Sequence, residues 1–211
     1  MVHFFLLVNL AILISGRGSN MIAILDAIKN KYILNVDKVL VISNKRESIG
    51  FHLAKDRYGI YTELIMSYNL TNNEFDEKIV KVLKSYDIQP SNGLVCLAGF
   101  MKILDPYIVN MYKHRIMNIH PSLLPSFKGL HAQKQALDAG VKISGCTVHF
   151  VDNAVDTGPI ILQKCVPVFD TDTELVLSER ILIEEHNIYK KAINLFTNDK
   201  LKIENNKVSL K

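Results

Sequence analysis

The sequence contains few cysteines and lacks the motifs that bind structural zinc. Its 211 residues include only Cys96, Cys146 and Cys165, which are far apart and form no Cys-x-x-Cys pair, and no His-Glu-x-x-His motif occurs. An odd number of isolated cysteines is typical of buried thiols in a reducing compartment rather than of a disulfide framework. We therefore expect a cytoplasmic protein without a metal site.

Charge of one sign is not concentrated in any part of the chain. The 25 basic and 21 acidic residues give a formal net charge of +4, and the lysines of the last third are spread out. No aromatic residues alternate with them, as they would on a platform for stacked bases. This pattern argues against nucleic-acid binding and supports at most a mild attraction for small anionic substrates.

The apolar N-terminus is too short to span a membrane. Met1–Val8 continues into Asn9–Ile14 and has the length of the apolar region of a signal peptide, but no Lys or Arg precedes it and no small-x-small cleavage site follows. We interpret residues 9–15 as a first buried strand and Met1–Val8 as an apolar lead-in that could cover a dimer surface. The sequence leaves open whether the protein is a monomer or a homodimer, and it indicates no membrane partner.

Apolar strand-like runs alternate with amphipathic helical stretches up to about residue 118. Such alternation predicts a mostly parallel, Rossmann-like sheet with ligands at the carboxyl ends of its strands. The second half predicts two adjacent strands (144–151 and 160–168), a long helix and a terminal strand pair. We expect one α/β domain over residues 1–211, flanked by helices and with a C-terminal antiparallel extension. The strands expected in the first half are 9–15, 36–43, 60–65, 93–98 and 115–118.

The loop Ser15–Asn20 (SGRGSN) joins the first expected strand to an apolar stretch with helical spacing. Glycines in such a loop let the backbone approach a phosphate, and the N-terminus of the next helix supplies free N–H groups. Ser19 or Asn20 is expected to cap this helix, as Asn72 or Asn73 is expected to cap the third. A single Gly-x-Gly is weak evidence, and a tight turn with no ligand explains the loop equally well.

The stretch Asn118–Gly129 (NIHPSLLPSFKG) combines a carboxamide, an imidazole and two prolines after a short apolar run. Asn118 and His120 leave the same face of an extended backbone, and Pro121 biases His120 away from helical geometry. An asparagine can hydrogen-bond a developing oxyanion, and a histidine can move a proton near neutral pH, which suits acyl chemistry. These residues alone fit a buried or turn histidine beside a turn-forming asparagine equally well.

Six segments, in their order and spacing, resemble the phosphoribosylglycinamide formyltransferases of purine biosynthesis. The resemblance covers residues 9–203. The NIHPSLLP element is shared by several formyl-folate enzymes, whereas the GRGSN loop and the compact length favour the glycinamide ribonucleotide branch. No residues remain for the RNA-binding domain of a methionyl-tRNA formyltransferase or the regulatory domain of a formyltetrahydrofolate hydrolase. The segments are SGRGSN, LAGFMKIL, NIHPSLLPSFKGLHA, GCTVHFV, DTGPIILQKCVPV and EEHNIY.

This resemblance implies transfer of a formyl group from the co-substrate 10-formyltetrahydrofolate to the amine of glycinamide ribonucleotide. By motif, Asn118, His120 and Asp156 occupy the positions of the catalytic trio. Asn118 would donate a hydrogen bond to the formyl oxygen in a tetrahedral intermediate, and His120 would act as a general acid or a cationic stabiliser. Asp156 would raise the pKa of the imidazole through its charge. The alternative for Asp156 is a turn carboxylate before Gly158-Pro159.

The resemblance also implies which residues bind the two substrates. Gly18, Ser19 and Asn20 match the phosphate loop, and Glu185 matches a position near the ribose and amine, with a solvated helix glutamate as its alternative. Residues 9–112 are expected to form a phosphoribosyl-binding lobe, and residues 113–211 a folate-binding and catalytic lobe. The expected folate-binding residues are Met101, Lys102, Ile103, Leu104, Asn118, Asp152, Asn153, Ala154, Val155 and Asp156.

Some positions depart from the family pattern or stay open. Lys102 stands where arginine is common, and Asn73 lies where many members carry an arginine close to the folate, which leaves charged contacts there open. His149 is expected to be structural because it lies in a strand. The role of His131 and the cis or trans state of Leu124-Pro125 are open.

Two other functions compete with formyl transfer. The first is hydrolysis of 10-formyltetrahydrofolate by the same trio, and the phosphate loop argues against it because a hydrolase has no phosphorylated acceptor to hold. The second is a catalytically silent protein that binds a nucleotide or folate, and the intact trio argues against it.

Overall fold

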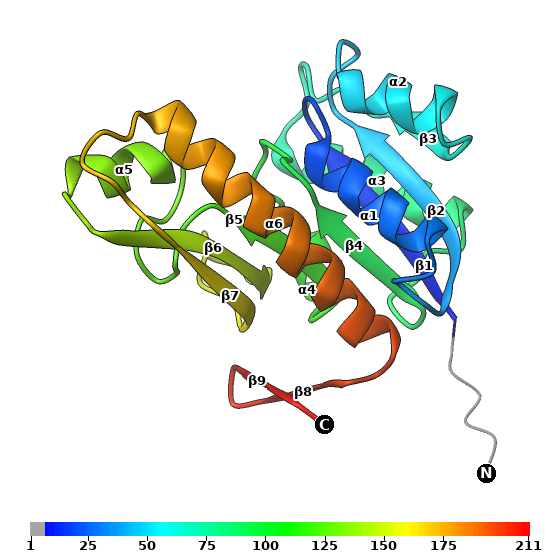
Figure 1. The fold of residues 1–211 in the computed structure, drawn as a ribbon. Coiled ribbons are helices and arrows are strands. Elements are labelled where there is room, and N and C mark those ends of the chain that lie inside the picture. The colour runs from blue at the N-terminus through cyan, green and yellow to red at the C-terminus, as the bar shows by residue number, and fades with distance from the viewer. Residues whose placement is uncertain (1–6) are drawn as a thin grey trace.

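The computed structural model describes residues 7–211, so most of the expected lead-in Met1–Val8 lies outside the described residues. Seven strands form one sheet in the order β3-β2-β1-β4-β5-β6-β7 (Figure 1). The first five strands of this order run parallel, and β6 and β7 are antiparallel additions. The expected fold class is confirmed. The strands are β1 Val8–Ile14, β2 Val36–Ser43, β3 Tyr61–Leu64, β4 Gly93–Leu97, β5 Ile116–His120, β6 Ile143–Phe150 and β7 Ile160–Pro167.

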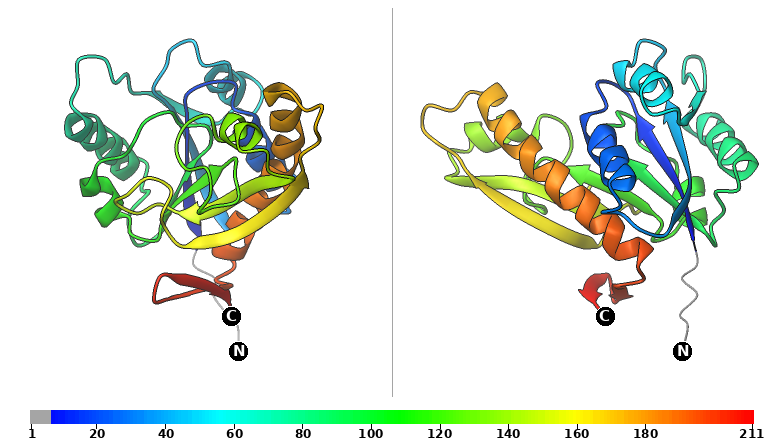
Figure 2. Two further views of the ribbon diagram at one scale, coloured as in Figure 1. Left: turned by 90° about the vertical axis from the view of Figure 1, so that its left-hand side faces the viewer. Right: turned by 45° about the vertical axis from the view of Figure 1, so that its right-hand side comes forward.

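Helices cover both faces of the sheet (Figures 1 and 2), which explains why β1 is apolar at every position but one. Successive side chains of a strand point to opposite faces, so a strand covered on both sides has no solvated face. Leu10, Ile12 and Ile14 pack toward α1 (Ser19–Lys29) and α6 (Glu174–Thr197). Ala11 and Leu13 pack toward α3 (Asn72–Ser85) and α4 (Pro106–Met111). The two shorter helices are α2 Ile49–Asp56 and α5 Ala132–Asp138.

Two of the expected helix caps are wrong. The N-cap of α3 is Thr71, whose hydroxyl accepts from the N–H of Glu74 at 3.3 Å while the Glu74 carboxylate accepts from the N–H of Thr71 at 2.8 Å. This reciprocal capping box satisfies two free donors of the first turn, more than a lone Asn cap would. The N-cap of α1 is Gly18 in the left-handed conformation, and this residue has no side chain to cap the helix.

The chain ends in a hairpin of β8 (Leu201–Glu204) and β9 (Lys207–Leu210), which lies next to β7 (Figure 1). Three apolar side chains, Leu201, Ile203 and Val208, pack against the core on the α6 side. The strand pair after the long helix is therefore confirmed. Among residues 7–211, no helix is long and apolar enough to cross a membrane.

Candidate active site at the carboxyl ends of the central strands

The loops after β1, β4 and β5 meet at one edge of the sheet, as expected for parallel strands. Leu13 pairs with Leu97, and Leu97 pairs with Asn118, so these strand ends are neighbours. Ser15 joins the first two loops: its N–H donates to Gly99 O at 3.1 Å, and its hydroxyl accepts from Met101 N–H at 2.8 Å. The glycine loop thus directly adjoins the segment Met101–Leu104.

His120 ends β5 and is only 4% exposed. Its Nε2 lies 2.8 Å from Phe127 O, and its Nδ1 lies 3.2 Å from Asp156 Oδ2. A carbonyl oxygen and a carboxylate both accept, so the site satisfies both ring nitrogens when His120 is an imidazolium. Burial nevertheless lowers the pKa of His120, and the Phe127 carbonyl and Asp156 only partly offset it. Asp156 raises the pKa of His120 as expected, but desolvation outweighs the ion pair, so the pKa lies below its usual value.

Asp156 reaches His120 from the connection between β6 and β7. Its Oδ2 accepts from Gly129 N–H at 2.9 Å, and its Oδ1 lies 3.6 Å from His149 Nε2. Burial raises the pKa of Asp156, but its interactions with His149, with Gly129 N–H and with His120 outweigh burial, so the pKa lies below its usual value. Asp156 is therefore a carboxylate at neutral pH.

The connection that carries Asp156 is shaped by side chains of its own residues. Asp152 Oδ1 accepts from Ala154 N–H at 3.3 Å and from the Thr157 hydroxyl at 2.7 Å, which closes the turn. At Gly158 the chain passes so close to β6 that an added Cβ would lie 1.9 Å from Phe150 O. Only glycine fits there, so the Gly-Pro pair after Asp156 has a steric reason.

His149 lies in the site, contrary to the expectation that it is only structural. In the antiparallel ladder it pairs with Asn118, and Thr147 pairs with His120. His149 Nδ1 donates to Phe150 O at 2.8 Å, and its Nε2 lies 3.2 Å from Asn118 Nδ2 and 3.6 Å from Asp156 Oδ1. His149 Nε2 thus lies between the Asn118 carboxamide and the Asp156 carboxylate.

The loop after His120 is anchored by two residues that the sequence analysis did not single out, Thr147 and Gln163. The Thr147 hydroxyl donates to Ser122 O at 2.7 Å and accepts from Leu124 N–H at 3.1 Å. The Gln163 amide donates to that hydroxyl at 3.0 Å and to Leu124 O at 2.9 Å. These bonds hold the loop that supplies Phe127 O to His120. The Leu124-Pro125 bond in this loop is cis.

The residues expected to bind the ribonucleotide come from α1 and α6. Asn20 Nδ2 donates to Glu185 Oε2 at 2.7 Å, and both side chains are buried. Asn20 Oδ1 is buried, and no residue in the described range 7–211 donates a hydrogen bond to it. Burial raises the pKa of Glu185, which the hydrogen bond from Asn20 opposes. The alternative of a solvated Glu185 is therefore wrong, and the pair offers two buried acceptors to a donor group of a ligand.

Ser48 and Gly50, at the start of α2, hold the glycine loop and were also missed. The Ser48 hydroxyl donates to Gly16 O at 2.8 Å, and Gly50 N–H donates to the same oxygen at 3.1 Å. An added Cβ at Gly50 would lie 2.9 Å from the Cα of Gly18. The two glycines therefore let α2 approach the loop.

The two segments expected to bind folate are largely exposed. Met101 and Ile103 are 66% and 67% exposed, although Leu104 is buried. Asn153 Nδ2 donates to Asn110 Oδ1 of α4 at 3.1 Å. Within residues 7–211, no hydrogen bond joins residues 101–104 to residues 152–156. Exposed apolar side chains beside buried polar groups are typical of a surface that accepts a flat aromatic ligand.

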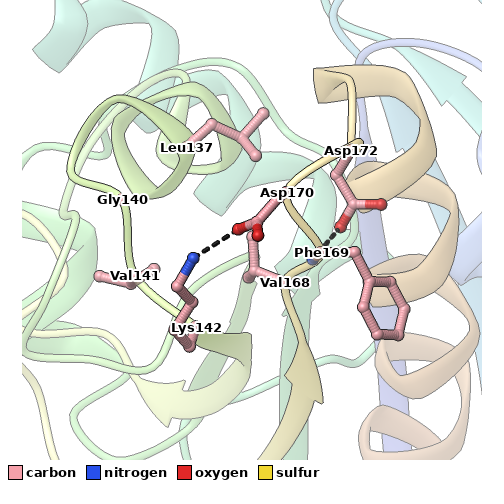
Figure 3. A pocket seen from close by; sticks show the side chains of 8 residues that line it. All are labelled: Leu137, Gly140, Val141, Lys142, Val168, Phe169, Asp170 and Asp172. Carbon is pink, nitrogen blue, oxygen red and sulfur yellow. Dashed lines mark hydrogen bonds and ion pairs between the residues drawn. The ribbon is translucent and has the colours of Figure 1, made fainter.

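A pocket of about 230 Å³ lies elsewhere, between the end of α5 and the turn before α6 (Figure 3). Lys142 and Asp170 form an ion pair there, and Asp172 accepts from Phe169 N–H at 2.9 Å. Its lining residues include none of those described above. Among residues 7–211, no group of three or more His, Cys, Asp or Glu side chains is arranged to hold a metal ion.

A Rossmann-like sheet with an asparagine, a histidine and an aspartate joined at its carboxyl edge defines the class of this protein. The model of the formyl transferase family matches residues 8–193, and the chain belongs to this family.

Within the family, the chain is similar to the phosphoribosylglycinamide formyltransferase of Escherichia coli, at 40% identity over 94% of this chain and 91% of that protein. A crystal structure of glycinamide ribonucleotide transformylase 1 from Symbiobacterium toebii has 43% identity and a TM-score of 0.90, and covers 97% of this chain and 94% of that one. A trifunctional purine biosynthetic protein of Bos taurus is 45% identical over 94% of this chain, which spans 19% of that protein. The resemblance found in the sequence is confirmed.

Proposed function

We propose that the chain transfers the formyl group of 10-formyltetrahydrofolate to the amine of 5-phosphoribosylglycinamide. The amine nitrogen attacks the formyl carbon, and the carbonyl electrons move to oxygen in a tetrahedral intermediate. When the intermediate collapses, the carbon–nitrogen bond to the folate breaks, the leaving nitrogen takes up a proton, and the nitrogen that attacked loses one. Two of the similar proteins carry the name of this activity, which supports the choice of acceptor.

The observation that carries the proposal is the connected group of Asn118, His120, His149 and Asp156 at the end of β5. Each side chain in it has a defined partner and a buried or half-buried position. Such preorganised groups stabilise charge that develops in a transition state without reorganising. The glycine loop beside the group supports a phosphorylated acceptor.

Asn118 is proposed to stabilise the oxyanion. One hydrogen of its Nδ2 points to His149 Nε2, and the second hydrogen is left to donate to the formyl oxygen. The half-buried position of Asn118 at the end of a strand leaves the amide accessible to a ligand. For this role we assign His149 the tautomer in which Nδ1–H donates to Phe150 O and Nε2 accepts from Asn118 Nδ2.

His120 is proposed to supply positive charge and a proton. The Asp156 carboxylate stabilises its imidazolium form, whereas burial favours loss of the proton. A ring balanced in this way gives up a proton readily, which suits a general acid for the leaving nitrogen. Both N–H groups contact the protein, so direct transfer from His120 requires one of these contacts to open.

The ribonucleotide is proposed to bind between the glycine loop and α6. Backbone N–H groups at Gly18, Ser19 and Asn20 begin α1 and can receive the phosphate. Asn20 Oδ1 and the Glu185 carboxylate are acceptors that fit ribose hydroxyls or the substrate amine.

The folate is proposed to lie against the segments 101–104 and 152–156. Exposed Met101 and Ile103 fit the flat pterin, and backbone groups of both segments remain free to contact its edge. The division into a phosphoribosyl lobe (9–112) and a folate lobe (113–211) stays a proposal. Because Glu185 belongs to the second lobe and Met101 to the first, each substrate would contact both lobes. We propose action as a monomer or homodimer, without nucleic-acid or membrane partners.

A formyl-transfer assay tests the proposed function. Purified protein is mixed with 10-formyltetrahydrofolate, with and without glycinamide ribonucleotide, and folate absorbance reports turnover. We expect turnover that requires the acceptor and is lost in His120→Ala. Turnover that ignores the acceptor would support hydrolysis instead, and folate binding without turnover would leave a silent binding protein.

A further inference from the structure

Asp76 is a buried carboxylate outside the proposed catalytic group. It lies in the first turns of α3, on the face that also buries Phe75 and Ile79, and it is 0% exposed. Among residues 7–211, its Oδ2 accepts one hydrogen bond, from Asp105 N–H at 2.5 Å, and its Oδ1 is buried without a partner. A buried carboxylate with one hydrogen bond is costly for folding, which indicates a role other than packing.

The Asp76–Asp105 hydrogen bond holds one end of the segment Met101–Leu104. At the other end, Met101 N–H donates to the Ser15 hydroxyl at 2.8 Å. In the part of the chain that the structure describes, residues 102–104 take part in no backbone–backbone hydrogen bond. The segment is therefore held at each end by the side chain of a residue from another element.

The first turn of α3 also contacts this segment through aromatic and cationic side chains. Phe100 stacks on Phe75 with ring centroids 6.3 Å apart and planes 13° apart. Lys102 Nζ lies 5.0 Å from the centroid of the same Phe75 ring. Phe75 and Asp76 thus contact the chain on both sides of Ile103, at Phe100 and Lys102 before it and at Asp105 after it.

We propose that Asp76 is a positioning residue for folate: it fixes the backbone of Met101–Asp105, and its removal weakens folate binding but not ribonucleotide binding. The inference rests on the proposed function, because it takes Met101–Leu104 as a folate-binding segment. Ser15 is not selective in this way, since it contacts the loops on both sides.

The charge of Asp76 adds a pH dependence to this positioning. The charged groups that face Asp76 are the Asp105 carboxylate and the Lys102 ammonium. Burial raises the pKa of Asp76 to about 6; Asp105 N–H and Lys102 oppose this rise, and the Asp105 charge adds to it. The ionised form is the stronger acceptor for Asp105 N–H. Folate affinity is therefore expected to be highest above pH 6 and to fall as the pH drops below it.

Direct binding measurements on the full chain test the inference. Dissociation constants for 10-formyltetrahydrofolate and for glycinamide ribonucleotide are measured by calorimetry from pH 5 to 8. In Asp76→Leu, which removes the acceptor, we expect folate affinity to fall by about tenfold or more at pH 7.5, which corresponds to about 1.4 kcal/mol for each tenfold step. In Asp76→Asn, which keeps an acceptor without charge, folate affinity should be independent of pH and equal to that of the wild type at pH 5. Ribonucleotide affinity should stay within about twofold in both, since it involves none of these contacts.

A matched control is Glu63→Gln. The Glu63 carboxylate accepts a hydrogen bond from the Tyr86 hydroxyl at 2.8 Å, and Tyr86 lies at the C-terminal end of α3. This substitution should leave folate affinity unchanged. Equal folate affinity in the wild type and in a folded Asp76→Leu would overturn the inference and leave the proposed function intact, as would a wild-type pH profile retained in Asp76→Asn. If Asp76→Leu does not fold, the dependence of folate affinity on pH in Asp76→Asn alone tests the inference. A wild type that binds no folate would overturn both the inference and the proposed function.

Discussion

The glycine loop Ser15–Asn20 lies among packed backbone, whereas the segment Met101–Leu104 is held by the side chains of Ser15 and Asp76. In the loop, Gly16 O accepts two hydrogen bonds from the start of α2, and an added Cβ at Gly50 would meet the Cα of Gly18. The segment has exposed apolar side chains and little backbone hydrogen bonding of its own.

This difference matches the ligands proposed for the two regions. The glycine loop is the ribonucleotide side of the site, and the segment Met101–Leu104 is its folate side. A phosphate is recognised by backbone N–H groups at fixed positions, so the loop that binds it must be rigid. A flat aromatic ligand is bound over a large surface, so the segment that contacts it can adjust its side chains. We therefore expect added volume to damage the ribonucleotide side and lost hydrogen bonds to damage the folate side.

The largest effect is expected for His120, which belongs neither to the ribonucleotide side nor to the folate side. His120→Ala removes the proposed proton donor and cation, so kcat should fall by about 10²- to 10⁴-fold. The polar contacts described for the His120 ring are with Phe127 O and Asp156, so we expect the KM values for the two substrates to change little. Steady-state kinetics with each substrate varied in turn measures this. A rise in one KM with kcat unchanged would contradict this and indicate that His120 binds that substrate instead.

Gly50→Ala should damage only the ribonucleotide side. The added methyl would meet the backbone of Gly18, which cannot move away as a flexible side chain could. We expect the KM for the ribonucleotide to rise by about tenfold, in line with typical strain costs of 1–3 kcal/mol for overpacking, and the KM for folate to stay unchanged. Lys55→Ala, at an exposed position of the same helix, is the control. Equal rises in both KM values would show that the two sides are not independent.

Asp76→Asn should change the stability of the protein, because it removes the buried charge that holds the segment on the folate side. Because the folded pKa of Asp76 is raised to about 6, the folded state holds its proton more tightly than the unfolded state does. The contribution of Asp76 to the free energy of unfolding is therefore expected to fall as the pH rises from about 4 to about 6, and then to stay level. Removing this charge should stabilise the protein at pH 7.5 by about 1–3 kcal/mol. Urea denaturation at pH 4 to 8 measures the difference; a variant less stable than the wild type at pH 7.5 would contradict the raised pKa.

The smallest effect is expected for Lys102→Met. The ammonium lies over the Phe75 ring, and a cation–π contact at a half-exposed site contributes about 0.5–1 kcal/mol. The apolar stem is kept, so the KM for folate should rise less than about fivefold. A much larger rise would indicate that Lys102 leaves Phe75 and contacts the folate directly.

The sequence predicts those parts of the fold that depend on the spacing of apolar residues. Continuous apolar runs predict the buried strands, and their alternation with helices predicts that they run mostly parallel. Helix caps were less predictable, because Thr71 and Asn72 are both good caps and only the reciprocal bond of Glu74 selects Thr71.

The site was predictable only in part. The resemblance placed Asn118, His120 and Asp156 in one group, but His149 enters it through the register of β6 against β5, which local patterns do not fix. Burial of His120 likewise depends on long-range packing, so the direction of its pKa could not be read from its neighbours in sequence. Asp76 reads as an ordinary polar residue near a helix start, and only the position of Asp105 reveals its partner.

The most direct test follows the formyl carbon itself. Protein is incubated with 10-formyltetrahydrofolate labelled with ¹³C in the formyl group and with glycinamide ribonucleotide, and ¹³C NMR distinguishes a formamide from free formate. Our account predicts that the label appears in the formamide of the ribonucleotide and that Asn118→Ala slows its appearance by about 10²- to 10³-fold. Label that appears as formate at the same rate with and without the ribonucleotide would contradict it.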